Sequence, residues 1–175
     1  MTEEKRKMIL DWMRKIHQLE YANIYQSIYW SKREKVIGIL AFALSTLIAC
    51  SYRFPGIEPE TFKKLPFIFK HEFMIPLLTT IVAILTGLQT FLKPGEKSEA
   101  HRKLGNNYEK LRHKIETVLN GILMEHELNQ KIESIRKEWK NMEYLNVSPS
   151  NFDKGKKRVK ELNKYPEELG FLPNQ

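Results

Sequence analysis

Small and polar residues recur at helical spacing inside two uncharged apolar runs of this chain. In residues 73–92, Thr79, Ala83, Thr86 and Thr90 lie 4, 3 and 4 apart, with Gly87 and Gln89 beside them. In residues 36–52, three small residues recur at every fourth position: Ala41, Ser45 and Ala49. Small residues let helices approach closely in lipid, whereas hydroxyl and amide groups can line a water-filled path through an oligomer. The pattern leaves both interpretations open.

A basic cluster follows the second apolar run. Its members are Arg102, Lys103, Lys110 and Arg112. Side chains of this kind beside a membrane contact anionic lipid headgroups. The alternative is a site for an anionic signal, such as a cyclic nucleotide, at an interface between subunits.

Patterns that would indicate catalysis or cofactor chemistry are missing from the sequence. Glu109, His113 and Glu116 share a helix face, but we expect a solvated or intersubunit charged face there and no metal site. The sequence has no glycine-rich phosphate loop, no nucleophile elbow and no HExxH motif. Cys50 is the single cysteine, which excludes a disulfide framework. We therefore predict no enzyme, no catalytic residue and no cofactor.

The elements that carry the small and polar residues are the two apolar runs themselves, at 36–52 and 73–92. Neither contains Asp, Glu, Lys, Arg or His. Because a helix rises about 1.5 Å per residue and a bilayer core is roughly 30 Å thick, runs near this length can span it. The sequence therefore predicts an all-α membrane protein with a two-span helical hairpin over 36–92, in which residues 53–72 form the loop.

Amphipathic helices are predicted on both sides of this hairpin. Residues 1–35 are expected to form one N-terminal helix that continues into the first span, since no Pro or Gly occurs before Gly38. Residues 93–147 are expected to form a long helix or a helix pair, with a phase shift near Gly121 that marks either a bend or a back-folding second helix. Residues 148–175 are expected to be a polar tail with one short helix at 153–164.

An apolar seam with coiled-coil spacing is predicted in the segment that follows the second span. Successive members lie 4, 3, 4, 3 and 4 residues apart: Leu104, Tyr108, Leu111, Ile115, Val118 and Ile122. The N-terminal helix offers one partner for this apolar face. A single helix pair buries little surface, so we assign the seam to a homo-oligomer.

The distribution of positive charge predicts orientation. Three Lys or Arg residues precede the first span closely, six follow the second, and four lie in the loop. The positive-inside rule then places both termini in the cytoplasm of a two-span protein of the cell inner membrane. The net charge of +8 is spread over all hydrophilic parts, so it indicates the lipid bilayer as partner and does not indicate nucleic acid.

A short motif suggests a family resemblance. The second span ends in Leu88-Gln89-Thr90-Phe91-Leu92, and a basic segment follows with His101-Arg102-Lys103-Leu104-Gly105, Tyr108, Leu111-Arg112 and Ile115-Glu116. Together with the layout, this resembles the SLATT family, the SMODS- and SLOG-associating two-transmembrane effector domains of bacteria. The resemblance covers roughly residues 8–145.

The resemblance implies a membrane effector of antiviral defence, which acts by forming pores or disrupting the membrane and leads to growth arrest or cell death. We expect no fused sensor, so the trigger would be a separate sensor or signal-producing protein, or a cyclic nucleotide. The alternative function is a membrane-anchored scaffold whose cytoplasmic helices recruit a partner enzyme.

Overall fold

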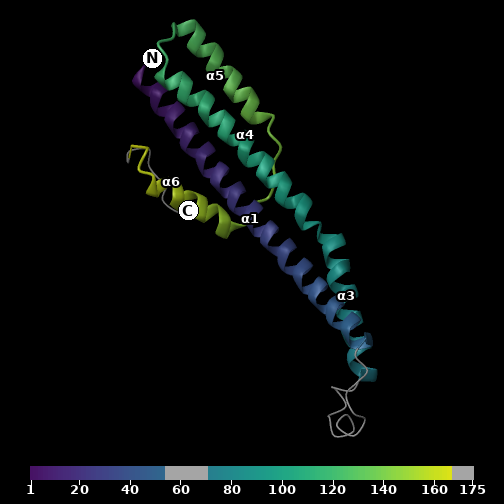
Figure 1. The fold of residues 1–175 in the computed structure, drawn as a ribbon. Helices are drawn as coiled ribbons and strands as arrows, with labels where there is room; N and C mark the ends of the chain where they lie inside the picture. The colour runs from purple at the N-terminus through teal and green to yellow at the C-terminus, as the bar shows by residue number, and fades with distance from the viewer. Residues whose placement is uncertain (54–70, 167–175) are drawn as a thin grey trace. The chain divides into compact units, whose positions relative to one another are not determined.

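All regular structure in the computed structural model is α-helical within the part of the chain that it describes, residues 1–53 and 71–166 (Figure 1). Five helices follow one another: α1 (Glu3–Arg53), α3 (His71–Leu92), α4 (Pro94–Asn120), α5 (Glu125–Lys140) and α6 (Pro149–Glu161). Most of the predicted loop at 53–72 and the end of the predicted tail, 167–175, lie outside the described residues.

The chain divides into two compact units. One consists of Met1–Tyr29 with Lys97–Gln175, and we name it the charged bundle. The other is Trp30–Glu96, which we name the apolar unit. Within the described residues, one helical segment, which begins at Phe73, is long and apolar enough to cross a membrane, and none of its apolar stretch is buried. The other apolar run, 36–52, forms the C-terminal part of α1.

In the apolar unit, α3 lies beside the C-terminal part of α1 (Figure 1). Partly covered side chains recur along α1 at Ile37, Ala41, Leu44 and Ile48, and along α3 at Leu78, Val82, Leu85, Gln89 and Leu92. Both rows follow the 4 and 3 spacing of a helix seam. Each helix therefore covers one row of the other and leaves its remaining faces exposed.

The junction between α3 and α4 is a single residue. Lys93 has a φ of 44°, in the left-handed region that breaks a helix, and α4 begins at the next residue, Pro94. Proline suits the first position of a helix because its missing N–H would have no partner there. In the sequence, the Pro94-Gly95 pair indicates an interruption after the second apolar run. In the structure both residues belong to α4, and the helix is interrupted at Lys93.

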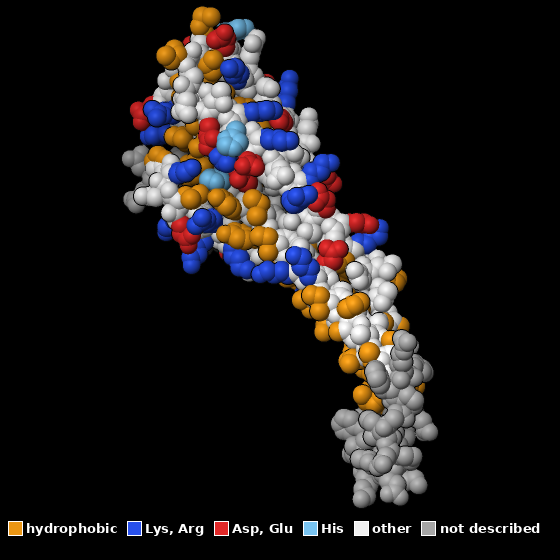
Figure 2. Space-filling view, viewed as in Figure 1, with side chains coloured by type: hydrophobic (Ala, Val, Ile, Leu, Met, Phe, Trp, Pro, Cys, Tyr) orange, Lys and Arg blue, Asp and Glu red, His pale blue; other side chains and the backbone are white. Residues whose placement is uncertain are grey.

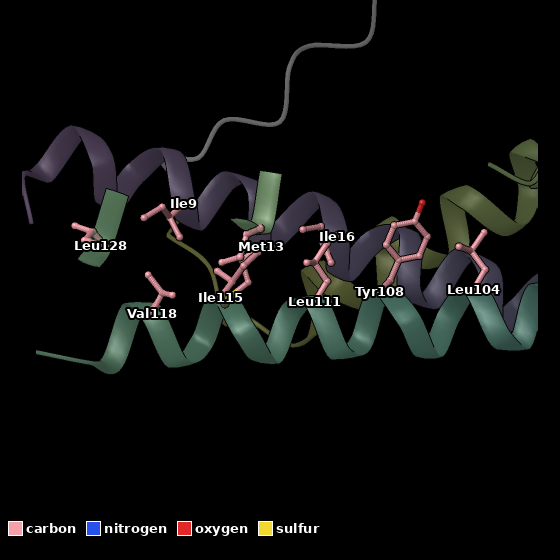
Figure 3. Close-up of a cluster of buried hydrophobic side chains, with 10 residues drawn as sticks. Ile9, Met13, Ile16, Leu104, Tyr108, Leu111, Ile115, Val118 and Leu128 are labelled. Carbon is pink, nitrogen blue, oxygen red and sulfur yellow. The ribbon is translucent and has the colours of Figure 1, made fainter. Parts of the chain in front are cut away.

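The core of the charged bundle lies where α1, α4 and α5 meet (Figure 3). Ile9, Met13 and Ile16 of α1 face Val118, Ile115 and Leu111 of α4, in antiparallel order. Helix α5 adds Leu128 and Ile135, and the Trp12 and Trp139 rings meet edge to face at 6.1 Å. Each fully buried aliphatic side chain contributes about 1.5–3 kcal/mol, so this cluster holds the bundle together.

The phase shift near Gly121 is a chain reversal. Helix α4 ends at Asn120, α5 begins at Glu125, and α5 returns along α4, where Lys114 Nζ lies 2.6 Å from a Glu138 carboxylate oxygen. Of the two alternatives for this segment, the structure has the back-folding helix and not the bend. The reversal lets α5 cover the apolar side chains of α4 that α1 leaves open.

Helix α6 packs on α1, so the segment predicted as a polar tail is part of the bundle. It begins at Pro149 and ends at Glu161, earlier than the predicted 153–164. Asn151, Gly155 and Val159 are buried at spacings of four residues. Gly155 makes the contact possible, because a Cβ there would lie 2.8 Å from the Gln18 carbonyl oxygen. The polarity of the segment hid this packing, since only one of its three buried residues has a large apolar side chain.

Candidate functional site

The apolar unit divides the predicted pore-lining or packing residues between two faces. Ala41 and Gln89 lie in the covered rows between α1 and α3, and Gly87 is half-buried beside them. The other six are exposed: Ser45, Ala49, Thr79, Ala83, Thr86 and Thr90. The helix that α3 packs on thus leaves the threonine face of α3 uncovered.

Every described hydroxyl on this exposed face donates a hydrogen bond within its own helix. Thr79, Thr86 and Thr90 donate to the carbonyl oxygens of Ile75, Val82 and Thr86, at 2.7 to 3.0 Å. Ser45 does the same to Ala41 at 2.8 Å. A hydroxyl satisfied in this way costs little in hydrocarbon, and its oxygen can still accept a second hydrogen bond.

The glycines of the apolar runs have open space beside them. A Cβ added at Gly38 or Gly87 would meet no atom within 4 Å. Glycine in a membrane helix usually permits a close approach of backbones. The packing of α1 against α3 leaves the space beside these two glycines empty. That space is therefore available for the close approach of a further helix to the apolar unit.

Three of the predicted residues meet at one end of the apolar unit. Thr86, Gln89 and Thr90 line an open hollow of about 480 Å³, together with Glu34 and the start of α4. Sequence reasoning missed Glu34, whose carboxylate lies so close to Gly95 that a Cβ there would sit 2.5 Å from Glu34 Oε1. The lining of the hollow is about half polar and half apolar, because it lies where the uncharged runs give way to charged sequence.

The predicted basic cluster does not form one surface. Arg102, Lys103 and Lys110 are exposed, and Arg102 pairs with Glu99 on its own helix at 2.8 Å. Arg112 is buried, so its assignment to lipid or signal binding is wrong. It faces inward because it lies on the same side of α4 as Leu111 and Ile115, toward a carboxylate of α1.

Arg112 is the centre of a buried ion-pair network between α1 and α4. Its Nε lies 2.8 Å from Glu20 Oε2 and its Nη1 lies 2.6 Å from Glu116 Oε1. Burial by itself lowers the pKa of Arg112, but the two carboxylates outweigh burial and the net shift is upward. Arg112 therefore stays charged and fixes the register of α4 on α1.

The N-terminal half of α1 also buries uncharged polar side chains, which hydrogen-bond to α4 and α6. His101 Nδ1 lies 2.9 Å from Asn23 Oδ1. Gln26 Oε1 accepts from Asn151 Nδ2 at 2.8 Å and from the backbone N–H and hydroxyl of Ser148. These contacts give the bundle geometric specificity, because a shifted register would leave buried polar groups without partners.

His17 is a buried titratable group that makes the stability of the charged bundle depend on pH. It is 3% exposed, and its Nδ1 lies 2.9 Å from Tyr165 Oη. Burial, with the positive charges of Arg112 and Lys164, lowers its pKa from 6.5 to about 4, although the nearby Glu116 carboxylate opposes the shift. Between about pH 4 and pH 6.5, His17 is therefore neutral in the folded protein but protonated in an unfolded chain.

We predict that acid weakens the charged bundle through His17. The pKa of His17 is lower in the folded protein than in an unfolded chain. The contribution of neutral His17 to the free energy of unfolding is therefore fully present above pH 6.5 and is lost as the pH falls toward about 4. The loss over that window amounts to about 3 kcal/mol. Unfolding of the full chain in detergent micelles across these pH values should show a slope that His17→Gln removes. The exposed His126→Gln is the control and should keep the slope; an unchanged slope in His17→Gln would contradict the assignment.

The predicted oligomer seam belongs mainly to the chain's own core. Leu104, Tyr108, Leu111, Ile115 and Val118 are buried within one chain, whereas Ile122 is fully exposed. The assignment of these five residues to an interface between subunits is therefore wrong, because α1 and α5 already cover them. Heptad spacing identifies a seam but does not say which chain fills it.

No group of three or more His, Cys, Asp or Glu side chains within residues 1–53 and 71–166 is placed to hold a metal ion. His113 lies between Glu109 and Glu116, at 3.8 and 2.8 Å, on the exposed side of α4. Comparison of the chain with protein-family models, with curated proteins and with solved structures finds no match.

Proposed function

We propose that the chain is a two-span membrane protein whose apolar unit associates with further copies and permeabilises the bilayer, while the charged bundle stays in the cytoplasm. The observation that carries this proposal is the exposed threonine face of α3: Thr79, Ala83, Thr86 and Thr90. A face of small residues on an uncharged helix lets the helices of separate copies pack closely in lipid. The positive charge that flanks both runs supports the cytoplasmic placement.

The biological setting of this proposal is bacterial antiviral defence. Its support is the resemblance of residues 8–145 to the SLATT effectors, which rests on the residues and layout of the chain alone. In that setting a separate sensor or a nucleotide signal would act on the charged bundle, and association of the apolar units would follow in the cell inner membrane. Loss of membrane potential would then arrest growth.

The experiment compares leakage and oligomer formation in liposomes that contain the full chain. At raised protein density, the wild type should release a small encapsulated dye and form cross-linked oligomers. Ala83→Leu with Thr86→Leu places bulk on the threonine face and should abolish both. Ile81→Leu with Ile84→Leu, at exposed apolar positions of the same helix, is the control and should retain both. A wild type that inserts but neither leaks nor cross-links would contradict the proposal.

A second candidate function is a membrane-anchored scaffold that recruits a partner enzyme. Ile122, Met124 and Tyr144 favour it, because these large apolar side chains of the charged bundle are strongly exposed. A partner that covered them would bury apolar area at no cost to the bundle's own core. Tight binding of a candidate enzyme that is lost in Ile122→Ser with Met124→Ser, together with an absence of leakage, would favour the scaffold.

A further inference from the structure

Helix α6 presents a basic face that none of the described helices covers. Its inward face is used by Asn151, Gly155 and Val159, and its exposed side chains lie on the rest of the helix surface. Residues 149–166 contain six Lys or Arg and two Asp or Glu, and Lys154, Lys157, Arg158 and Lys160 are exposed. Figure 2 shows such blue side chains grouped at the edge of the charged bundle.

The two acids of α6 do little to neutralise these charges. Asp153 lies 3.8 Å from Lys156, and Glu161 lies 3.5 Å from Arg158, both on the solvent side. Exposed pairs at such distances are weak and readily exchanged. Lys154 and Lys157 form no ion pair within the described residues. The exposed side of α6 therefore keeps a net positive charge that a larger anionic surface can satisfy.

We propose that this face of α6 binds the anionic headgroups of the bilayer. This inference rests on the proposed function, in which the chain is a membrane protein. Charge complementarity supports lipid as the occupant. The packing of α6 supports it as well, because α6 docks on Gln18 and Ala22 of α1, and α1 continues into the apolar run. Between these parts α1 carries the aromatic residues Tyr25, Tyr29 and Trp30, which are of a kind typical of a membrane–water boundary.

The binding face can be probed at Ser150, which shares one side of α6 with Lys154 and Lys157 at spacings of 4 and 3. Ser150 is exposed and uncharged, so Ser150→Cys keeps the charge of the helix. In a Cys50→Ser background this cysteine carries a single fluorophore. The full chain is placed in nanodiscs of phosphatidylcholine alone or mixed with phosphatidylserine, and quenching by a headgroup-attached quencher is measured.

Quenching is expected with phosphatidylserine and not with phosphatidylcholine alone, and salt near 1 M should remove it because the screening length falls to about 3 Å. Lys154→Gln with Lys157→Gln should lower the ratio of lipid-bound to unbound α6 about thirtyfold, at about 1 kcal/mol for each lysine. Lys131→Gln with Lys137→Gln, two exposed lysines of α5, is the matched control and should leave the ratio unchanged.

The outcomes separate this proposal from the one on which it rests. A chain that does not enter nanodiscs contradicts the two-span membrane protein. A chain that enters them but shows equal quenching in both lipids overturns lipid binding by α6 alone. Binding of a short RNA duplex to the chain in neutral nanodiscs, lost in the α6 variant and without any phosphatidylserine-dependent quenching, would assign the face to nucleic acid and also overturn it.

Discussion

Arg112→Met is expected to destabilise the charged bundle by about 3–5 kcal/mol, which is a large part of the stability of an ordinary domain. The reason is that Glu20, the buried partner of Arg112, remains in the variant. Glu20 keeps a carboxylate that is 7% exposed, and its close cationic partner at 2.8 Å is gone. A buried charge without a partner costs several kcal/mol, and Glu116 loses its 2.6 Å contact as well. The readout is the free energy of opening of the α4 amides, from hydrogen exchange of the full chain in micelles.

Arg102→Met is the matched control for this prediction. It removes the same side chain from the same helix, but Arg102 and its partner Glu99 are 65% and 63% exposed. An exposed pair contributes about 0–1 kcal/mol, so the two variants should differ by several kcal/mol. Glu20→Met with Arg112→Met should recover much of the loss, because two apolar side chains replace the buried pair. Equal effects of Arg112→Met and Arg102→Met would contradict the buried network.

This comparison also tests the charge-based prediction about α4. The sequence does not distinguish Arg112 from the other members of the basic cluster, because the spacing of the four residues does not exclude a common basic surface. The other members are Arg102, Lys103 and Lys110. What separates them is the helix face: Leu104, Leu111 and Ile115 fix the buried side of α4, and Arg112 lies next to Leu111 on that side. A charge at the edge of an apolar seam therefore needs a partner on the facing helix, which here is Glu20.

The helices themselves could be predicted because their signals are local. The absence of Pro and Gly before Gly38 predicts one helix from the N-terminus into the first apolar run, and α1 is unbroken from Glu3 to Arg53. The 4 and 3 spacing of Leu104 to Val118 predicts the buried face of α4. These patterns depend only on the geometry of a single helix, so no knowledge of its neighbours is required.

The contacts of α1 with α6 could not be predicted in the same way. They use Gly155, which contributes no side chain, and hydrogen bonds from Ser148 and Asn151 to Gln26. Polar residues in a lysine-rich segment usually indicate a solvated surface. Their burial follows from pairing across more than a hundred residues, and no local periodicity contains that information.

Leu111→Ala is expected to destabilise the bundle by about 2–5 kcal/mol, whereas Ile122→Ala should change its stability by less than about 0.5 kcal/mol. Both residues belong to the same 4 and 3 repeat of the sequence, so a seam between subunits would make both matter for assembly. In one chain, however, Leu111 is fully buried in the core that α4 forms with α1 and α5, and Ile122 is fully exposed beyond the end of α4. The cost at Leu111 is the lost apolar burial plus the cavity that alanine leaves.

Two readouts on the same pair of variants distinguish a core from an interface. Hydrogen exchange of the α4 amides measures the stability of the bundle, and cross-linking in liposomes measures assembly. If the repeat is the chain's own core, Leu111→Ala lowers protection even when the protein is too dilute to assemble. If instead the repeat joined subunits, the loss in Leu111→Ala would depend on protein concentration and Ile122→Ala would share it. Because α1 and α5 already cover Leu111 within one chain, we expect a concentration-independent loss in Leu111→Ala alone.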